Sequence, residues 1–341
     1  MTNLSPPIEI PTWPYVYGQP SAQGKIRTLP EDFIVIENLA FEPSGTGEHA
    51  FLQITKSGEN TDYVARQLAK FAGVRQHDVG YAGLKDRHAV TTQWFSVWLP
   101  GKADPDWTLF ETDNIKVLHS VRHARKLKRG VLSGNRFQLR IRDWQGDKDK
   151  TEQQLQAMKA NGIANYYGTQ RFGYAGQNVN KALELFQGKK VGREQRSLYL
   201  SAARSYLFNR ILAERVSRDN WNQPLAGDVY MFDLSHSYFK ADDPDAEIIR
   251  RLNAKEIHPS GVLWGRGEAS LTSIEQAVID AHPELAEGLI ASGVDRNRRA
   301  LRVNVPDLQW QFVGDTELEL AFTLPAGSYA TALLREIIEV D

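Results

Sequence analysis

The chain has 341 residues, of which 41% are hydrophobic and 24% are charged, a composition typical of a soluble globular protein with about two domains. It has no cysteine, which excludes disulfides, a thiolate nucleophile and a cysteine-ligated metal, and its eight histidines lack a metal-binding spacing, so we expect neither a metal nor a cofactor. The net charge of −1 is unlike that of a dedicated nucleic-acid binder. The chain also lacks a signal-like start and an apolar run of about 18 residues, so we expect a cytoplasmic protein with no membrane span.

The N-terminal stretch predicts an extended arm, because prolines stand at positions 6, 7, 11 and 14. Two strands are predicted after it, at residues 33–37 and 50–55, from their β-branched and aromatic content. Between them, residues 45–50 match the Gly-x-Gly-x-x-Ala dinucleotide fingerprint, which should open a helix after a strand. Here the motif leads into a strand, so we predict a hairpin loop and no bound dinucleotide.

A helix is predicted over residues 60–73, with a polar residue at its start and Gly73 at its end. Val64, Leu68 and Phe71 form its apolar stripe, which we expect to face the core. The next predicted strand covers residues 93–99.

A single carboxylate, Asp86, stands between Lys85 and Arg87 in the segment that joins this helix to this strand. Flanking cations favour the ionised form of a carboxylate, and an ionised carboxylate can attack a sugar carbon of a substrate that carries phosphates. The same triplet is common in solvated surface turns. From the residues alone, both interpretations stay open.

Basic residues are concentrated between positions 116 and 142, where nine Lys or Arg occur without one Asp or Glu. Residues 135–142 alternate as a strand, with Phe137, Leu139 and Ile141 on one face and mostly basic side chains on the other. This pattern predicts a cationic strand face that can hold a phosphate backbone, although the whole chain is nearly neutral.

The second half of the chain changes in character twice. A helix is predicted from about residue 151 to 160, and residues 161–304 look mostly helical, with a run at 271–292 that Pro283 must kink or split. Strand character returns after residue 302, and Ser328 is placed to cap a final helix. These observations predict one α/β domain that is interrupted by a mostly helical insertion.

Four segments in chain order, residues 29–37, 83–93, 134–137 with 165–173, and 324–336, resemble those of the tRNA pseudouridine synthase D family. The resemblance implies an isomerase that detaches uracil at position 13 of tRNA, rotates it and rejoins it as pseudouridine, as a monomer without cofactor or metal. It also implies an α/β (α+β) fold, with a mixed-sheet catalytic domain of residues 1–160 plus 304–341, an inserted domain of residues 161–303, and a cleft between them.

By resemblance, Asp86 is the catalytic aspartate. Arg335 of the last helix is implied as its supporting cation, and Lys85 is implied either to contact phosphate or to support the turn. Arg87 stands where the family usually has Lys, which preserves the charge. Whether Asp86 attacks the ribose or the base ring stays open.

Three further residues are implied to bind the substrate: Phe33, Asn135 and Tyr329. Phe33 would line the uridine pocket and Asn135 would meet a base or ribose edge through its amide. Tyr329 stands where the family commonly has Phe, and its ring would stack on the base, while the added hydroxyl needs a partner if it is buried. A stacked uracil cannot rotate in place, so the nucleotide must be flipped out.

Two other functions are compatible with parts of the sequence. A non-catalytic RNA-binding module would use only the basic residues and the aromatics. A glycoside hydrolase would need a second carboxylate, which Glu31, Asp32 or Glu37 could supply, although no spacing favours any of them.

Overall fold

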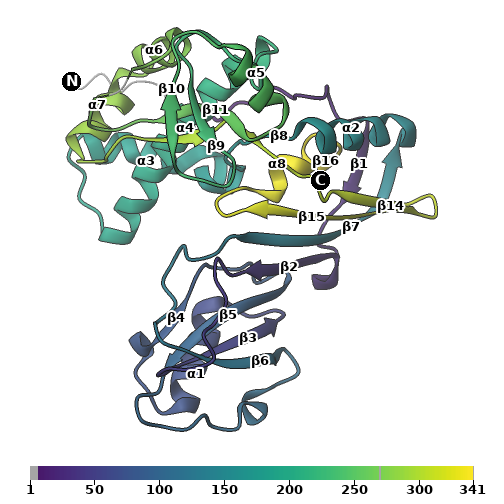
Figure 1. The fold of residues 1–341 in the computed structure, drawn as a ribbon, viewed down its shortest axis with the longest axis vertical. Coiled ribbons are helices and arrows are strands. Elements are labelled where there is room, and N and C mark those ends of the chain that lie inside the picture. The colour runs from purple at the N-terminus through teal and green to yellow at the C-terminus, as the bar shows by residue number, and fades with distance from the viewer. Residues whose placement is uncertain (1–6, 269, 341) are drawn as a thin grey trace. The chain divides into compact units, whose positions relative to one another are not determined.

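The chain packs as two units in the computed structural model, which describes residues 7–268 and 270–340 (Figure 1). The sheet unit contains residues 20–159, 305–327 and 337–340, and the insertion unit contains residues 7–19, 160–304 and 328–336. The breaks near 160 and 304 lie next to the predicted domain boundaries. The N-terminal arm and residues 328–336, however, pack with the insertion rather than with the predicted catalytic domain.

The sheet unit is built on a ten-stranded mixed sheet whose central path runs β14-β15-β7-β2-β5-β3-β6. Neighbours on this path are antiparallel except β2 and β5, which are parallel. The strands are β1 (Ala22–Lys25), β2 (Phe33–Asn38), β3 (His49–Lys56), β4 (Val79–Tyr81), β5 (Val90–Trp98), β6 (Ile115–His123), β7 (Gly134–Gly146), β14 (Gln309–Val313), β15 (Glu317–Pro325) and β16 (Glu339–Val340).

The predicted hairpin between the first two strands is wrong. Residues 45–50 do lead into β3, but β3 does not pair with β2, because β5 lies between them. Most residues of β5 are buried, on both of its faces, as suits a central strand, whereas β2 alternates between buried and half-buried positions. Proximity in sequence therefore misled the prediction of pairing.

Helix α1 (Thr61–Ala72) matches its prediction closely. Gly73 ends it in the left-handed conformation, with φ 63°, and Val64 and Leu68 are fully buried in the core that the helix forms with β3 and β5. Phe71 packs against the edge of the same core. A second helix of the sheet unit, α2 (Lys148–Asn161), follows β7.

The insertion unit is less helical than predicted, because it also holds a four-stranded sheet in the order β10-β9-β11-β12 and the two-stranded pair β8-β13. Its strands are β8 (Ile163–Ala164), β9 (Val229–Phe232), β10 (Tyr238–Lys240), β11 (Ile257–Leu263), β12 (Asn297–Ala300) and β13 (Arg302–Val303). These strands are short, and β11 contains Pro259 and Gly261, so the sequence carries a weak strand signal there.

Helices α3, α6 and α7 of the insertion unit pack against its longest helix, α4, whose Leu207, Phe208 and Leu212 are fully buried. Pro283 is the first residue of α7 and separates it from α6, which confirms the predicted split. The helices are α3 (Gln177–Phe186), α4 (Arg193–Ser217), α5 (Ala246–Asn253), α6 (Ser273–Asp280), α7 (Pro283–Ala291) and α8 (Ala330–Leu334). Within the described residues, every helix is too short or too polar to cross a membrane.

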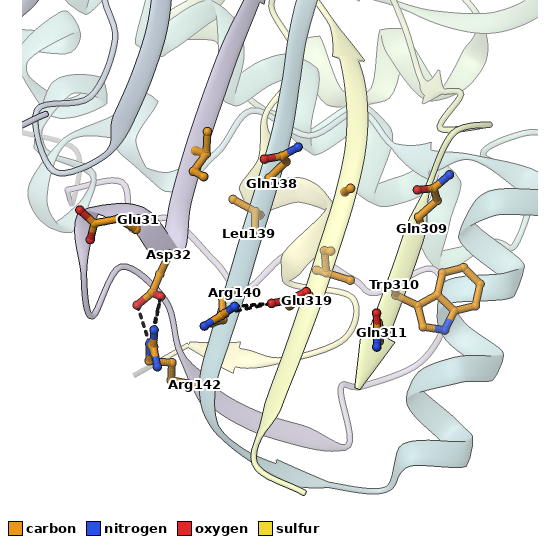
Figure 2. A pocket seen from close by; sticks show the side chains of 13 residues that line it. Glu31, Asp32, Gln138, Leu139, Arg140, Arg142, Gln309, Trp310, Gln311 and Glu319 are labelled. Carbon is orange, nitrogen blue, oxygen red and sulfur yellow. Dashed lines mark hydrogen bonds and ion pairs between the residues drawn. The ribbon is translucent and has the colours of Figure 1, made fainter. Parts of the chain in front are cut away.

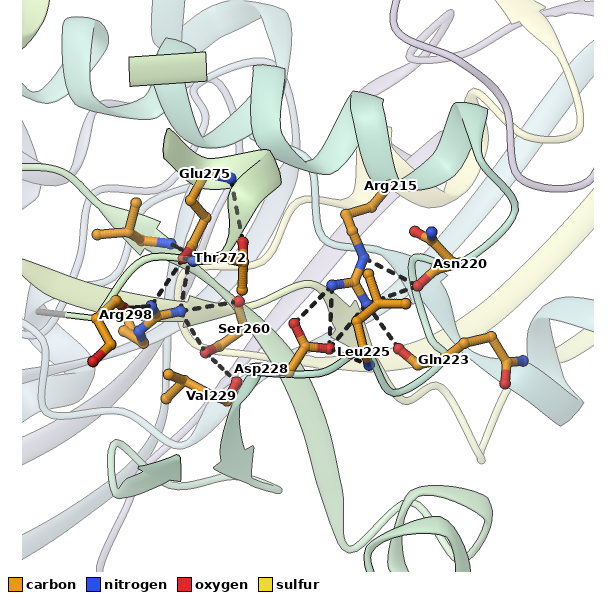
Figure 3. Close-up of polar contacts among 12 residues, drawn as sticks. Arg215, Asn220, Gln223, Leu225, Asp228, Val229, Ser260, Thr272, Glu275 and Arg298 are labelled. Atoms are coloured by element: carbon orange, nitrogen blue, oxygen red, sulfur yellow. Dashed lines mark hydrogen bonds and ion pairs between the residues drawn. The ribbon is translucent and has the colours of Figure 1, made fainter. Parts of the chain in front are cut away.

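Two buried ion pairs cross-link the insertion unit (Figure 3). Arg215 of α4 contacts Asp228 at 2.8 Å, and Arg298 of β12 contacts Glu275 of α6 at 2.9 Å. All four side chains are at most 4% exposed. Because a buried charge is costly without a partner, each pair must form for its elements to pack.

The predicted capping role of Ser328 is wrong. The N-cap residue of α8 is Tyr329, and the hydroxyl of Ser328 lies 3.5 Å from Oδ1 of Asn165 instead. Residues 7–19 of the N-terminal arm form no helix or strand, and residues 1–6 lie outside the described part of the chain. Trp13 of the arm is buried against the ring of Tyr166 in the insertion unit, with 6.0 Å between ring centroids. This contact explains why the arm belongs to the insertion unit.

Candidate active site

The segment that carries Asp86 is a loop, residues 82–89, between the adjacent antiparallel strands β4 and β5; we call it the aspartate loop. Thr61, the first residue of α1, accepts a hydrogen bond from the Lys85 amide at 3.0 Å and donates to Gln93 of β5 at 2.9 Å. Gln93 in turn donates to the Gly83 carbonyl at 3.1 Å. Buried side chains of a helix and a strand therefore fix the course of the loop.

The Asp86 carboxylate forms an ion pair with Arg27 of its own unit, with 3.2 Å between Oδ2 and Nη2. Its other oxygen accepts a hydrogen bond from the amide of His88 at 3.0 Å. The Asp86 side chain is 32% exposed, so it is held in place but accessible. An accessible carboxylate beside an arginine can act as a nucleophile or as a base.

Arg27 also connects Asp86 to Phe33. Its guanidinium lies over the Phe33 ring, 4.2 Å from the centroid, as in a cation–π contact. Its Nε is buried and has no hydrogen-bond partner among the described residues. Phe33 itself is only 4% exposed and packs edge-on against Phe137. The ring is thus mostly a core side chain, with one face covered by Arg27.

Lys85 points away from solvent and pairs with a buried carboxylate. Its Nζ contacts Oε2 of Glu37 at 2.5 Å, and the two side chains are 7% and 0% exposed. The other carboxylate oxygen of Glu37 accepts the Trp94 amide at 3.1 Å. Because Glu37 is fully buried and paired, it is a poor second carboxylate for glycoside hydrolysis.

Asn135 lies near the start of β7, in register with Glu37 of β2 and Leu324 of β15. Its side-chain oxygen is buried and has no hydrogen-bond partner among the described residues. A buried acceptor without a donor costs free energy, so this oxygen is a natural acceptor for a substrate group.

Tyr329 belongs to the insertion unit. The structure provides a hydrogen-bond partner for its hydroxyl, which the sequence could not identify. Arg171 donates to this hydroxyl through Nε at 3.1 Å and Nη2 at 2.5 Å, and its Nη1 donates to Ser201 at 3.0 Å. The Tyr167 ring lies edge-on to Tyr329, with 5.9 Å between centroids. Arg171 and Tyr167 fall in the segment 165–173, which we expected from the resemblance to be structural or to face the RNA rather than to be catalytic.

Arg335 also belongs to the insertion unit and fixes the N-terminal arm there. It donates to the Pro14 carbonyl at 3.1 Å and to Glu336 at 2.9 Å, and its guanidinium stacks 4.2 Å from the centroid of the Tyr15 ring. Its pairing with Asp86 would join two units and stays a prediction. The cation that contacts Asp86 within the sheet unit is Arg27.

The expected cationic face of β7 is only partly present, because neighbouring segments supply carboxylates to Arg140 and Arg142. Arg136 of the same face is exposed and belongs to none of the ion pairs found among the described residues. Figure 2 shows Arg140 hydrogen-bonded to Glu319 of β15 and Arg142 to Asp32, with donor–acceptor distances of 3.1 and 3.0 Å. Arg142 also contacts Glu317 at 2.9 Å. These pairs line a pocket of about 560 Å³ of mixed charge. The neutralising residues are more than a hundred positions away in sequence, so the local pattern could not reveal them.

A different part of the basic stretch lies beside the aspartate loop. Residues 124–130 form a mostly exposed loop, and the amide of Gly130 donates to the Ala82 carbonyl at 2.7 Å. Gly80 permits this close approach, because an added Cβ would collide with the carbonyl oxygen of Leu127. The exposed cations here include Arg125 and Lys128. We call residues 124–130 the basic loop.

Sequence reasoning missed two residues next to Asp86. Arg27 precedes the segment 29–37 by two positions and carries no signal of its own. Lys56 directly follows the strand predicted at 50–55, and a lysine next to a buried strand is a signal that could have been used. Among the described residues, His, Asp and Glu side chains do not cluster in a way that could hold a metal.

Comparisons with known proteins place these residues in a family context. A family model described as tRNA pseudouridine synthase D (TruD) matches residues 9–183 and 175–337. A curated protein of Methylococcus capsulatus named tRNA pseudouridine synthase D is 53% identical over 334 residues, covering 96% of this chain and 94% of the relative. One of Nitrosococcus oceani with the same name is 48% identical over 330 residues, with 94% and 92% covered. A solved structure from Methanosarcina mazei, at 21% identity, has the same fold with a TM-score of 0.70 over 94% of this chain and 95% of that one.

Proposed function

This chain belongs to the tRNA pseudouridine synthase D family, and on that premise we propose that it is an isomerase that converts uridine to pseudouridine in tRNA, with uridine 13 as its target. One observation carries the proposal beyond membership. The family-like segment 83–93 holds Asp86 accessible beside Arg27, in a loop that buried side chains fix.

The reaction exchanges one bond of ribose for another. The bond from C1′ of the ribose to N1 of uracil breaks, the ring turns, and a new bond forms from C1′ to C5. C5 then loses its proton, and N1 gains one. Asp86 can capture C1′ while uracil is detached, or it can take a proton from the ribose. Both routes need an ionised carboxylate within reach of the ribose, which an accessible Asp86 paired with Arg27 supports.

Substrate binding is assigned to the aromatic and amide side chains. Tyr329 would stack on the flipped base, with its ring oriented by Arg171, and the unpartnered oxygen of Asn135 would accept a hydrogen bond from the base or ribose. Phe33 would contribute the ring face that Arg27 now covers, so we expect Arg27 to shift when the nucleotide enters. The supporting roles of Lys85 and Arg335 are to hold the aspartate loop and the N-terminal arm.

The basic loop is the part of the sheet unit best suited to hold RNA. Its exposed cations lie next to the aspartate loop and would bind the phosphates that flank the flipped nucleotide. The face of β7 is a weaker choice, because Arg140 and Arg142 are already paired with carboxylates.

The test is to incubate tRNA with the wild-type chain and with Asp86→Asn, and to map pseudouridine at every uridine. We expect the wild type to modify position 13 and the variant to form no product while it still binds tRNA. A tRNA with cytidine at position 13 is the control for the site. An active Asp86→Asn variant would remove the role of Asp86. A wild type that binds tRNA without forming pseudouridine would favour the non-catalytic RNA-binding alternative.

A further inference from the structure

Lys56 is a fully buried lysine beside the aspartate loop. It is the last residue of β3 and is 0% exposed. Its Nζ donates to two main-chain carbonyls, that of Glu59 at 2.7 Å and that of Asp86 at 3.1 Å. None of the ion pairs within the described residues includes Lys56, so this ammonium is stabilised mainly by carbonyl oxygens.

The two carbonyls belong to different segments. Glu59 lies in the turn between β3 and α1, and Asp86 is the proposed catalytic residue itself. Lys56 therefore ties the main chain of Asp86 to the end of a central strand. The Asp86 side chain then extends from this fixed point to Arg27. A loss of the contact from Nζ would free the carbonyl of Asp86 and loosen the position of its carboxylate.

The charged groups around Lys56 come from two segments, Lys85 and Asp86 from the aspartate loop and Glu59 from the turn. On the neighbouring strands, the residues in register with Lys56 are uncharged: Thr91 of β5 and Ile115 of β6. Burial lowers the pKa of Lys56 to about 8, with Asp86 and Glu59 opposing the shift and Lys85 adding to it. Its proton is therefore lost in a range where an exposed lysine keeps it.

We propose that Lys56 is a positioning residue for the reaction, whose ammonium holds the main chain of Asp86 in the reactive geometry. The proposal rests on the proposed function, because it assigns Lys56 a role through Asp86. A charged donor makes stronger hydrogen bonds to carbonyls than a neutral amine does. Deprotonation of Lys56 thus weakens the contact to Asp86 without removing any packed atom.

The direction in which folding stability changes with pH distinguishes a positioning role of Lys56 from a purely structural one. In the unfolded chain a lysine keeps its proton up to about pH 10.4. Between about pH 8 and that value the folded state binds fewer protons at Lys56 than the unfolded state does. The contribution of this group to stability therefore rises with pH in this window. We expect catalysis to decline over the same window, opposite to the change in stability.

The experiment measures single-turnover rate constants on tRNA from pH 6.5 to 9.5, together with thermal unfolding at each pH. The variants are Lys56→Met, which removes the charge, and Lys56→Arg, which keeps it throughout. Lys70→Met is the matched control, since Lys70 is exposed on the last turn of α1. Ionisation of the uracil ring at high pH affects the wild type and the three variants alike, so it cancels in the ratios of their rate constants.

At pH 7 we expect Lys56→Met to react about 10- to 100-fold more slowly than the wild type, with KM little changed. Above pH 8 the wild-type rate should fall toward that of Lys56→Met, while Lys70→Met follows the wild type. A folded Lys56→Arg should lack the decline near pH 8. If Lys56→Met does not fold, the decline in the wild type and its absence in Lys56→Arg still support the proposal.

Parallel pH profiles for the wild type and Lys56→Met would overturn the role of Lys56. So would a wild-type decline that coincides with a fall in unfolding temperature, because that result indicates a structural role only. A wild type that forms no pseudouridine at any pH would instead overturn the proposed function, and the role of Lys56 in catalysis with it.

Discussion

Two arginine–aspartate pairs of this chain have the same chemistry and opposite surroundings. In the insertion unit Arg215 and Asp228 are 2.8 Å apart and 3% and 1% exposed. In the sheet unit Arg27 and Asp86 are 3.2 Å apart and 25% and 32% exposed. The comparison contrasts a structural carboxylate with the one proposed to react.

The buried pair is saturated with hydrogen bonds (Figure 3). Asp228 accepts from Arg215 and from the Leu225 amide at 2.8 Å, and Arg215 also donates to the carbonyls of Asn220 and Gln223. Burial raises the pKa of Asp228, and the charge and hydrogen bonds of Arg215 offset part of the rise. Such a carboxylate has no capacity left for a substrate.

The pair at Asp86 is incompletely bonded. Asp86 contacts Arg27 and one amide, and Arg27 keeps a buried Nε without a partner among the described residues. Free lone pairs on an accessible carboxylate and an unused donor beside it are what a reacting nucleotide can engage. The two pairs differ in how many hydrogen bonds their side chains form and in how exposed these side chains are. Neither property can be predicted from the residue types alone.

The largest effect is expected at the buried pair. Arg215→Met should lower the free energy of unfolding by about 3–5 kcal/mol, because Asp228 is then buried without a cation. Urea unfolding of the full chain measures the change. The double variant Arg215→Met/Asp228→Leu is the control and should recover much of the loss. A single variant within 1 kcal/mol of the wild type would contradict this account.

A smaller effect is expected at Arg27, on rate rather than on folding. Arg27→Met should slow single-turnover pseudouridine formation by about 10- to 100-fold, because the charged contact to Asp86 is lost. Arg27→Lys keeps the charge but not the planar contact with the Phe33 ring, and should fall between Arg27→Met and the wild type. Equal rates for all three chains would show that the pair is not used.

The smallest effect is expected at Tyr329. Tyr329→Phe keeps the ring but removes the acceptor of Arg171, so KM for tRNA should rise less than about tenfold with kcat little changed. Tyr329→Ala removes the stacking surface and should cost more, about 1–3 kcal/mol of binding free energy. Tyr329→Phe with a defect as large as that of Tyr329→Ala would show that the hydroxyl, not the ring, carries the contact.

Local patterns predicted the local structure well. The stripe of α1, its Gly73 end and the alternation of β7 follow from the periodicity of a few residues, and the structure confirms them. The split at Pro283 follows from the missing amide of proline. Each of these features depends on neighbours within one element.

Features that depend on distant residues were not predictable in the same way. Arg140 and Arg142 of β7 meet carboxylates of β15 and of residue 32, which neutralises most of the expected cationic face. The cation beside Asp86 comes from residue 27, ahead of β2, and the sheet of the insertion unit is made of short strands with weak signals. Resemblance predicts the catalytic role of Asp86, but only the fold reveals what Arg27 and Lys56 contact.

The most direct test measures Asp86→Asn and Asp228→Asn side by side, each for single-turnover pseudouridine formation and for free energy of unfolding. The account predicts that Asp86→Asn abolishes product while its stability stays within about 1 kcal/mol of the wild type. It predicts that Asp228→Asn loses several kcal/mol of stability, yet forms product at nearly the wild-type rate where it is folded. Product formation by Asp86→Asn, or a loss of folding as large as that of Asp228→Asn, would contradict the assignment of Asp86 as the reactive carboxylate.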